Sequence, residues 1–131
     1  MYKKADSLEG RSGEEEEERE ALLRRVLEHY QRCLDIYKAN GAPAEKIQSA
    51  EAGVAVAYAD LGEAALARAR GLGGSGDEAD EAKREALLKA AEGHYQRSLE
   101  ICKAASPGAP AAQGIPINEG QLAKVRAELA K

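Results

Sequence analysis

The chain has 131 residues, of which 32% are charged, and its formal net charge at pH 7 is −4. This length suits one hydrophobic core, so we expect a single domain over residues 1–131. Apart from the acidic run at 14–18, acidic and basic residues are interspersed, and the lack of a basic stripe argues against a nucleic-acid partner.

The composition favours helices over strands. The chain contains no Phe and no Trp, its aromatic residues are five Tyr, and Ala, the best helix former, is abundant. No apolar run is long enough to span a membrane, and the residues after Met1 lack the apolar centre of a signal peptide. We therefore expect a cytoplasmic, all-α protein in which Cys33 and Cys102 are free buried thiols.

The first long helix is predicted over residues 14–39, after a short helix at 2–9 that glycines end. Its apolar residues follow two adjacent seams, and both are predicted to be buried. The first seam consists of Leu23, Val26, Tyr30, Cys33 and Tyr37, and the second of Leu22, Val26, His29, Cys33 and Ile36.

Two further long helices are predicted over 43–70 and 77–105, on either side of a glycine-rich loop at 71–76. Gly62 is a candidate interruption of the first of them. Residues 106–116 contain three Pro and two Gly and predict a loop, and a last helix follows over 118–131. Because short connections place successive helices antiparallel, we expect a compact antiparallel bundle of three long helices with short N- and C-terminal helices.

The chain contains an internal repeat. A shift of 65 positions aligns Arg19–Ala39 with Arg84–Ala104, and 13 of the 21 aligned residues are identical, His-Tyr-Gln-Arg among them. The copies differ just before their histidines, where Leu27-Glu28 is replaced by Glu92-Gly93. The second copy therefore has less side-chain volume just before its histidine.

At these helices the chain resembles the tetratricopeptide repeat. The second helix of that motif has a small residue, an aromatic residue four later, a small residue three later and then Leu. Residues matching this order are Ala91, Tyr95, Ser98 and Leu99, and more loosely Val26, Tyr30, Cys33 and Leu34; residues similar to the first helix are Val54-Ala55, Tyr58 and Leu61-Gly62. The resemblance covers about half of the chain and implies protein or peptide binding in a concave groove.

Other features are typical of computationally designed helical proteins. They are the Glu-rich helix start, the Ala/Glu/Lys/Arg filler and the absence of Phe and Trp. The Pro/Gly loop and two unpaired cysteines are less typical of an idealised scaffold, and they indicate interior positions chosen for a site.

The preferred functional hypothesis is an interior pocket for a small apolar or aromatic molecule. Gly53 and Gly93 remove side-chain volume from helix interiors, at a cost of roughly 1 kcal/mol each relative to Ala. Residues with polar side-chain ends are predicted around these two glycines, where packing alone would favour apolar residues. A bound ligand could supply their hydrogen-bond partners. These residues are His29, Tyr30, Cys33, Tyr58, His94, Tyr95 and Ser98.

Two alternatives remain open. The first is a peptide-interaction module, as the resemblance implies. The second is a metal or haem site, since His29 and His94 occupy equivalent positions and His29 lies one turn from Cys33, a spacing that suits zinc. No catalytic motif accompanies these residues, so we expect a binding protein that is not an enzyme and has no cofactor.

Overall fold

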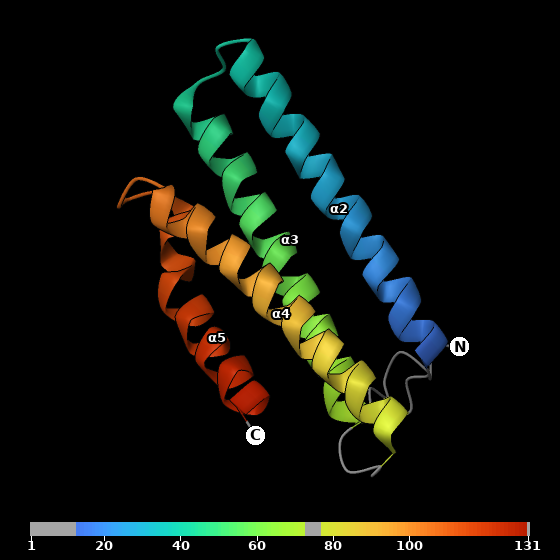
Figure 1. The fold of residues 1–131 in the computed structure, drawn as a ribbon. Helices are drawn as coiled ribbons and strands as arrows, with labels where there is room; N and C mark the ends of the chain where they lie inside the picture. Colours follow the sequence, from blue (N-terminus) through green and yellow to red (C-terminus); the bar gives the residue numbers. More distant parts are fainter. Residues whose placement is uncertain (1–12, 73–76, 131) are drawn as a thin grey trace, which may run out of the picture.

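A computed structural model of the protein describes residues 13–72 and 77–130. In this part of the chain all regular structure is helical, which confirms the all-α prediction (Figure 1). The elements are α2 (Gly13–Ala39), α3 (Ala44–Gly71), α4 (Glu78–Ala104), the 3-10 helix η1 (Pro110–Gly114) and α5 (Ile115–Ala130). The short helix predicted at 2–9 lies outside the described residues.

Local sequence signals set the ends of the long helices. Gly41 has a φ of 64°, a left-handed conformation that glycine adopts without strain, and it terminates α2. Pro43 precedes α3, where its missing N–H costs nothing. Asp77 caps α4, because its carboxylate accepts a 2.9 Å hydrogen bond from the backbone N–H of Ala79.

Two boundary predictions were wrong. Helix α3 passes through Gly62 without a break, and the residues predicted as a loop at 106–116 include η1 and the first two residues of α5. Two of the three prolines in this stretch, Pro110 and Pro116, lie at a helix start. A proline is tolerated there because the first N–H groups of a helix have no partner inside it.

The helices pack in the order in which they follow one another along the chain. Helix α3 packs against α2 and α4, and α4 packs against α3 and α5. No comparable packing joins α2 to α4 or α5 within the described part, and Figure 1 shows α2 and α5 at opposite edges of the molecule. The helices therefore form an open array, and only the inner helices have a helix on each side.

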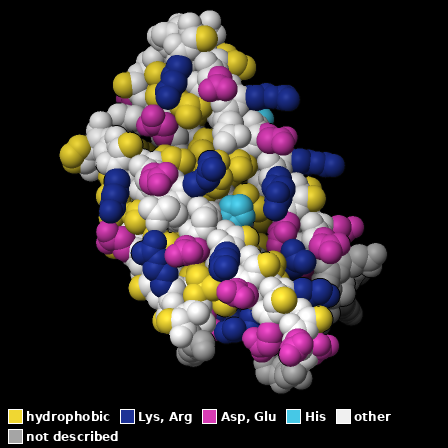
Figure 2. Space-filling view, viewed as in Figure 1, with side chains coloured by type: hydrophobic (Ala, Val, Ile, Leu, Met, Phe, Trp, Pro, Cys, Tyr) yellow, Lys and Arg dark blue, Asp and Glu magenta, His cyan; other side chains and the backbone are white. Residues whose placement is uncertain are grey.

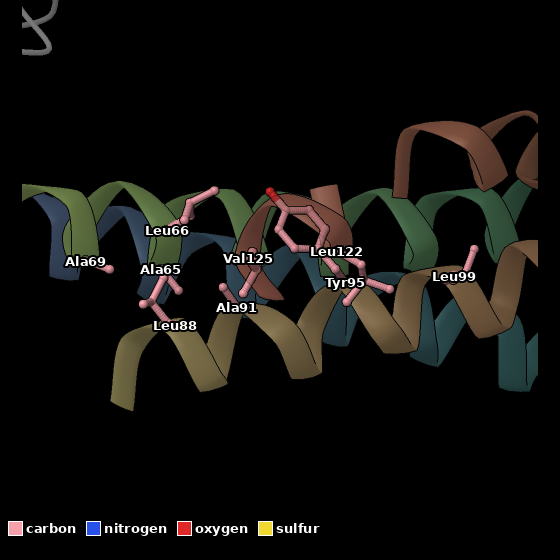
Figure 3. Close-up of a cluster of buried hydrophobic side chains, with 9 residues drawn as sticks. All are labelled: Ala65, Leu66, Ala69, Leu88, Ala91, Tyr95, Leu99, Leu122 and Val125. Carbon is pink, nitrogen blue, oxygen red and sulfur yellow. The ribbon is translucent and has the colours of Figure 1, made fainter. Parts of the chain in front are cut away.

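The hydrophobic core lies between α3, α4 and α5. Figure 3 shows its nine residues, with Tyr95 near the centre of the cluster. The members are Ala65, Leu66, Ala69, Leu88, Ala91, Tyr95, Leu99, Leu122 and Val125. Helix α2 contributes none of them. It packs against α3 outside this cluster, through contacts that include the ring of Tyr30 on Gly53 and an ion pair between Arg68 and Glu20, whose N–O distance is 3.0 Å.

Candidate functional site

The structure distributes the nine predicted site residues over different surroundings. Three of them, His29, Tyr30 and Cys33, line a surface hollow between α2 and α3. Tyr58 and His94 form a half-buried contact between α3 and α4, whereas Tyr95 and Ser98 are buried. The two glycines, Gly53 and Gly93, lie apart from one another on α3 and α4.

The hollow between α2 and α3 has a volume of about 250 Å³ and is open to solvent. Its lining mixes aromatic, sulfur and polar groups: His29, Tyr30, Cys33, Tyr37, Lys46, Ser49 and Ala50. The Sγ atom of Cys33 lies 3.6 Å from Nε2 of His29. The ammonium group of Lys46 lies 5.9 Å from the centre of the Tyr37 ring. The hollow is thus large enough for one side chain or a small organic group.

The two glycines do not create the interior space that was expected of them. The ring of Tyr30 covers Gly53 so closely that an added Cβ would lie 2.5 Å from it. Gly93 is exposed, and no atom lies within 4 Å of the position of its missing Cβ. The space at Gly53 is therefore filled by a side chain of this protein, and Gly93 faces solvent.

The two histidines lie in different environments. His29 is exposed on α2 and makes an edge contact with Tyr30. His94 on α4 stacks on Tyr58 of α3, with ring centres 6.4 Å apart. The Tyr58 hydroxyl in turn accepts a 3.3 Å hydrogen bond from the side chain of Gln31. The two histidines, although equivalent in sequence, therefore make separate contacts, His29 with Tyr30 and His94 with Tyr58.

The surroundings of His94 favour its neutral form. Burial lowers the pKa of His94 below its usual value, and the nearby cations of Arg24 and Arg97 lower it further. The carboxylate of Glu20 acts in the opposite direction but does not reverse the shift. At neutral pH, His94 is consequently an uncharged aromatic ring that packs on Tyr58.

Ser98 and Tyr95 obtain their hydrogen bonds from the protein itself, whereas the side-chain oxygen of the buried Asn118 has no hydrogen-bond partner. The hydroxyl of Ser98 donates a 2.7 Å hydrogen bond to the carbonyl of Ala55 and accepts a 2.9 Å bond from Asn118. The Tyr95 hydroxyl accepts a 3.1 Å bond from Gln121. Sequence reasoning did not identify Asn118, since a single polar residue in an otherwise amphipathic helix carries no signal of burial.

The internal repeat extends beyond the two helices that are similar in sequence. Arg19 of α2 pairs with Glu63 of α3 at 3.5 Å, and Arg84 of α4 pairs with Glu128 of α5 at 2.8 Å. Both pairs are separated by 44 positions, so the shift of 65 relates Glu63 to Glu128 as well. We therefore describe the protein as two copies of a two-helix unit: unit 1 is α2 and α3, and unit 2 is α4 and α5.

Contrary to the prediction, no residue of either seam of α2 is buried: Leu23, Cys33 and Tyr37 are half-buried, and the second seam is the more exposed of the two. We call its residues, Leu22, Val26, His29, Cys33 and Ile36, the open face of α2. Leu22 is 59% exposed, Val26 42% and Ile36 56%. In unit 2 the equivalent positions are better covered, and Ala91 and Ser98 are at most 1% exposed. The difference arises because α3 precedes and covers α4, whereas no described helix precedes α2.

Charged side chains of both signs are distributed over one face of the molecule. On the face shown in Figure 2, acidic and basic side chains alternate around a histidine, and apolar surface is visible between them. Among the described residues, no group of three or more His, Cys, Asp or Glu could hold a metal ion. None of the described helices combines the length and the apolar character that crossing a bilayer requires.

Comparisons with protein-family models, with curated proteins and with solved structures give no match.

Proposed function

We propose that the protein is a non-enzymatic interaction module that binds an amphipathic helix of a polypeptide on the open face of α2. The observation that carries this proposal is the exposure of Leu22, Val26 and Ile36 along a single helix face. Aligned exposed apolar residues mark interaction surfaces, and a helix binds to such a face through residues three and four positions apart. This function agrees with the peptide-binding role that the tetratricopeptide-like pattern implies.

The hollow beside this face supports the same function. His29 and Cys33 belong both to the open face and to the lining of the hollow, so the two form one continuous surface. Its volume of about 250 Å³ is suitable for a single apolar side chain. Interfaces of this kind are stabilised mainly by a few side chains that insert into such hollows at their centre.

We also infer that the helices of each unit run antiparallel, as expected for a binding array of helical hairpins. The contacts in unit 2 support this arrangement, because the partners occur in opposite order along the two helices. Arg84, near the start of α4, pairs with Glu128 near the end of α5. Ser98, further along α4, bonds to Asn118 near the start of α5.

A labelled synthetic peptide of residues 44–71 provides the test. This peptide is the α3 sequence, the helix that covers the equivalent face of α4. At low protein concentration, the peptide should bind the full chain saturably with micromolar affinity, as measured by fluorescence anisotropy. The double substitution Leu22→Glu/Ile36→Glu should weaken binding by about tenfold or more, because it places charges in the apolar contact.

Val56→Glu is the matched control, since Val56 is 58% exposed on α3 and lies outside the open face. It should leave the affinity for the peptide unchanged. Circular dichroism will show that each variant is folded, as expected for substitutions at exposed sites. Equal affinity of the wild type and the Leu22→Glu/Ile36→Glu variant would refute the proposed function.

Binding of a small aromatic molecule in the hollow is a second candidate function. It is favoured by one observation: three of the predicted ligand-binding residues, His29, Tyr30 and Cys33, do line one hollow. Ser49→Phe would fill this space from α3. If the hollow binds small aromatic molecules, this substitution should reduce the fluorescence of added 8-anilinonaphthalene-1-sulfonate, and unchanged fluorescence would exclude this site for the dye.

A further inference from the structure

The contact between units 1 and 2 shows which residues an α4-type helix requires of its partner. On α3, the carbonyl of Ala55 accepts the hydrogen bond of Ser98, and Tyr58 stacks on His94. Gly62 lies against the Tyr95 ring, and Ala65 belongs to the core cluster beside α4. These four positions of α3 are spaced by three, four and three residues, so they share one helix face.

The four equivalent positions on α5 differ in residue type at three places, and no described helix covers them. The shift of 65 that relates Glu63 to Glu128 carries the α3 face onto Gly120, Ala123, Ala127 and Ala130. All four are small and exposed, and no atom lies within 4 Å of the missing Cβ of Gly120. We call these residues the outer face of α5. The array thus ends, among the described residues, with an α3-type face that lacks its α4-type partner.

At the opposite edge of the molecule, α2 lacks an α3-type partner among the described residues. Helix α2 is an α4-type helix by sequence, with 13 of 21 aligned residues identical, yet no described helix covers its open face. The hollow also lies where unit 1 is less covered than unit 2. Its lining residues Cys33 and Tyr37 correspond to Ser98 and Cys102, which are buried in unit 2.

We propose that the partner of the open face of α2 is the outer face of α5 in a second copy of this chain. The two copies would pack head to tail, with α2 of one copy on α5 of the next as α4 packs on α3. This inference rests on the proposed function, because it names the helix that the open face of α2 binds. The interface between the copies would continue the one that already joins the two units.

Side-chain sizes at the two faces are complementary. The open face of α2 carries the large residues Leu22, Val26 and Ile36, whereas the outer face of α5 carries only Gly and Ala. Helix interfaces pack well when a large residue on one side faces a small one on the other. Compared with α3, α5 is larger at one position, where Ala127 replaces Gly62. The counterpart of Tyr95 does not obstruct this position, because the ring of Tyr30 lies on Gly53 of its own unit.

Head-to-tail contact has a distinctive consequence for assembly. Each copy uses two different faces, so association does not stop at a dimer unless the copies close into a ring. A symmetric dimer through two α2 helices would instead need only the open face. Blocking the two faces separately therefore distinguishes these modes of association.

The experiment is sedimentation velocity over a range of protein concentrations. The Leu22→Glu/Ile36→Glu variant blocks the open face of α2, and Ala123→Glu/Ala127→Glu blocks the outer face of α5. The wild type should form species that grow with concentration, whereas each variant alone should stay monomeric. An equimolar mixture of the two variants should form a dimer and nothing larger, because one intact face remains on each chain. Val56→Glu, outside both faces, should sediment as the wild type does.

Three results would overturn the proposal. They are a wild type that is monomeric up to roughly 1 mM, a variant with a blocked α5 that still self-associates, and a mixture that stays monomeric. Binding of the 44–71 peptide separates this failure from that of the proposed function. A monomeric wild type that binds the peptide would retain helix binding on α2 and exclude a second copy as the partner.

Discussion

The ring of Tyr95 on α4 lies directly against Gly62 on α3, so that a Cβ added to the glycine would be 2.9 Å from the ring. Tyr95 is only 2% exposed, and its hydroxyl is held by Gln121 of α5. The ring cannot move away without disturbing the core between the three helices. The close approach explains why α3 contains a glycine in its interior, where glycine is an unfavourable helix residue.

Gly62→Ala should therefore destabilise the protein by about 1–3 kcal/mol, because the methyl group overpacks the contact with Tyr95. Gly93→Ala is the matched control: Gly93 also lies inside a helix, but nothing surrounds it. That substitution should stabilise the protein by up to about 1 kcal/mol through helix propensity alone. Chemical denaturation measures both changes, and a stabilising Gly62→Ala would contradict the tight contact.

Ser98→Ala should lower the free energy of unfolding by about 1–3 kcal/mol. The substitution removes the donor to the Ala55 carbonyl and the acceptor for Asn118, both in the interior. Ser49→Ala, at an exposed position of α3, should change stability by no more than about 0.5 kcal/mol. Equal effects of the two substitutions in urea denaturation would show that the buried hydrogen bonds contribute nothing.

Stability should fall as the pH is lowered from 7 towards about 5.5 because of His94. The unfolded chain takes up a proton near the ordinary pKa of about 6.5, whereas the lowered pKa of folded His94 keeps it neutral to lower pH. In this window the unfolded state binds more protons, so acidification favours unfolding.

His94→Gln removes this titration and should flatten the dependence of the melting temperature on pH. His29→Gln makes the same change at an exposed histidine of α2 and should keep the slope that His94 causes. The raised pKa of Asp60 acts in the opposite direction, but nearer its ordinary value of 3.8. A His94→Gln variant with the slope of the wild type would contradict this explanation.

The two repeat-related ion pairs should differ in strength. Double-mutant cycles should give a larger coupling for Arg84–Glu128, at 2.8 Å, than for the more exposed Arg19–Glu63, at 3.5 Å. Both values should stay below about 1 kcal/mol and decrease as salt is added, as is usual for pairs near the surface. A stronger coupling for Arg19–Glu63 would contradict the order that distance and exposure predict.

The sequence predicted the long helices well because their ends depend on local chemistry. Gly41, Pro43 and Asp77 act through their own backbone or side-chain geometry, which does not depend on distant contacts. The repeat between α2 and α4 was visible because the residues are identical. Its extension to α3 and α5 was not, since Glu63 and Glu128 become recognisable as a pair only through their arginine partners.

Burial could not be predicted in the same way. The two seams of α2 are similarly apolar, and only the neighbouring helices decide which of them is covered. Polar residues such as Ser98 were interpreted as candidates for ligand binding because their partners, Ala55 and Asn118, are distant in sequence. The prediction of interior space at the two glycines was wrong for the same reason. The ring of Tyr30 fills the space at Gly53, and no atom lies near the missing Cβ of Gly93.

The reactivity of Cys33 shows whether a second copy covers the open face of α2, because this thiol belongs to that face and its counterpart Ser98, which bonds to α3, is 1% exposed. The measurement is the rate of Cys33 alkylation by excess iodoacetamide at increasing protein concentration. Cys102 is the internal reference, since it is 2% exposed and burial raises its pKa. If the copies associate head to tail, Cys33 should react several-fold more slowly as the protein concentration rises, and Ala123→Glu/Ala127→Glu should restore the rate found in dilute solution. A Cys33 rate that is the same at every concentration would contradict this association.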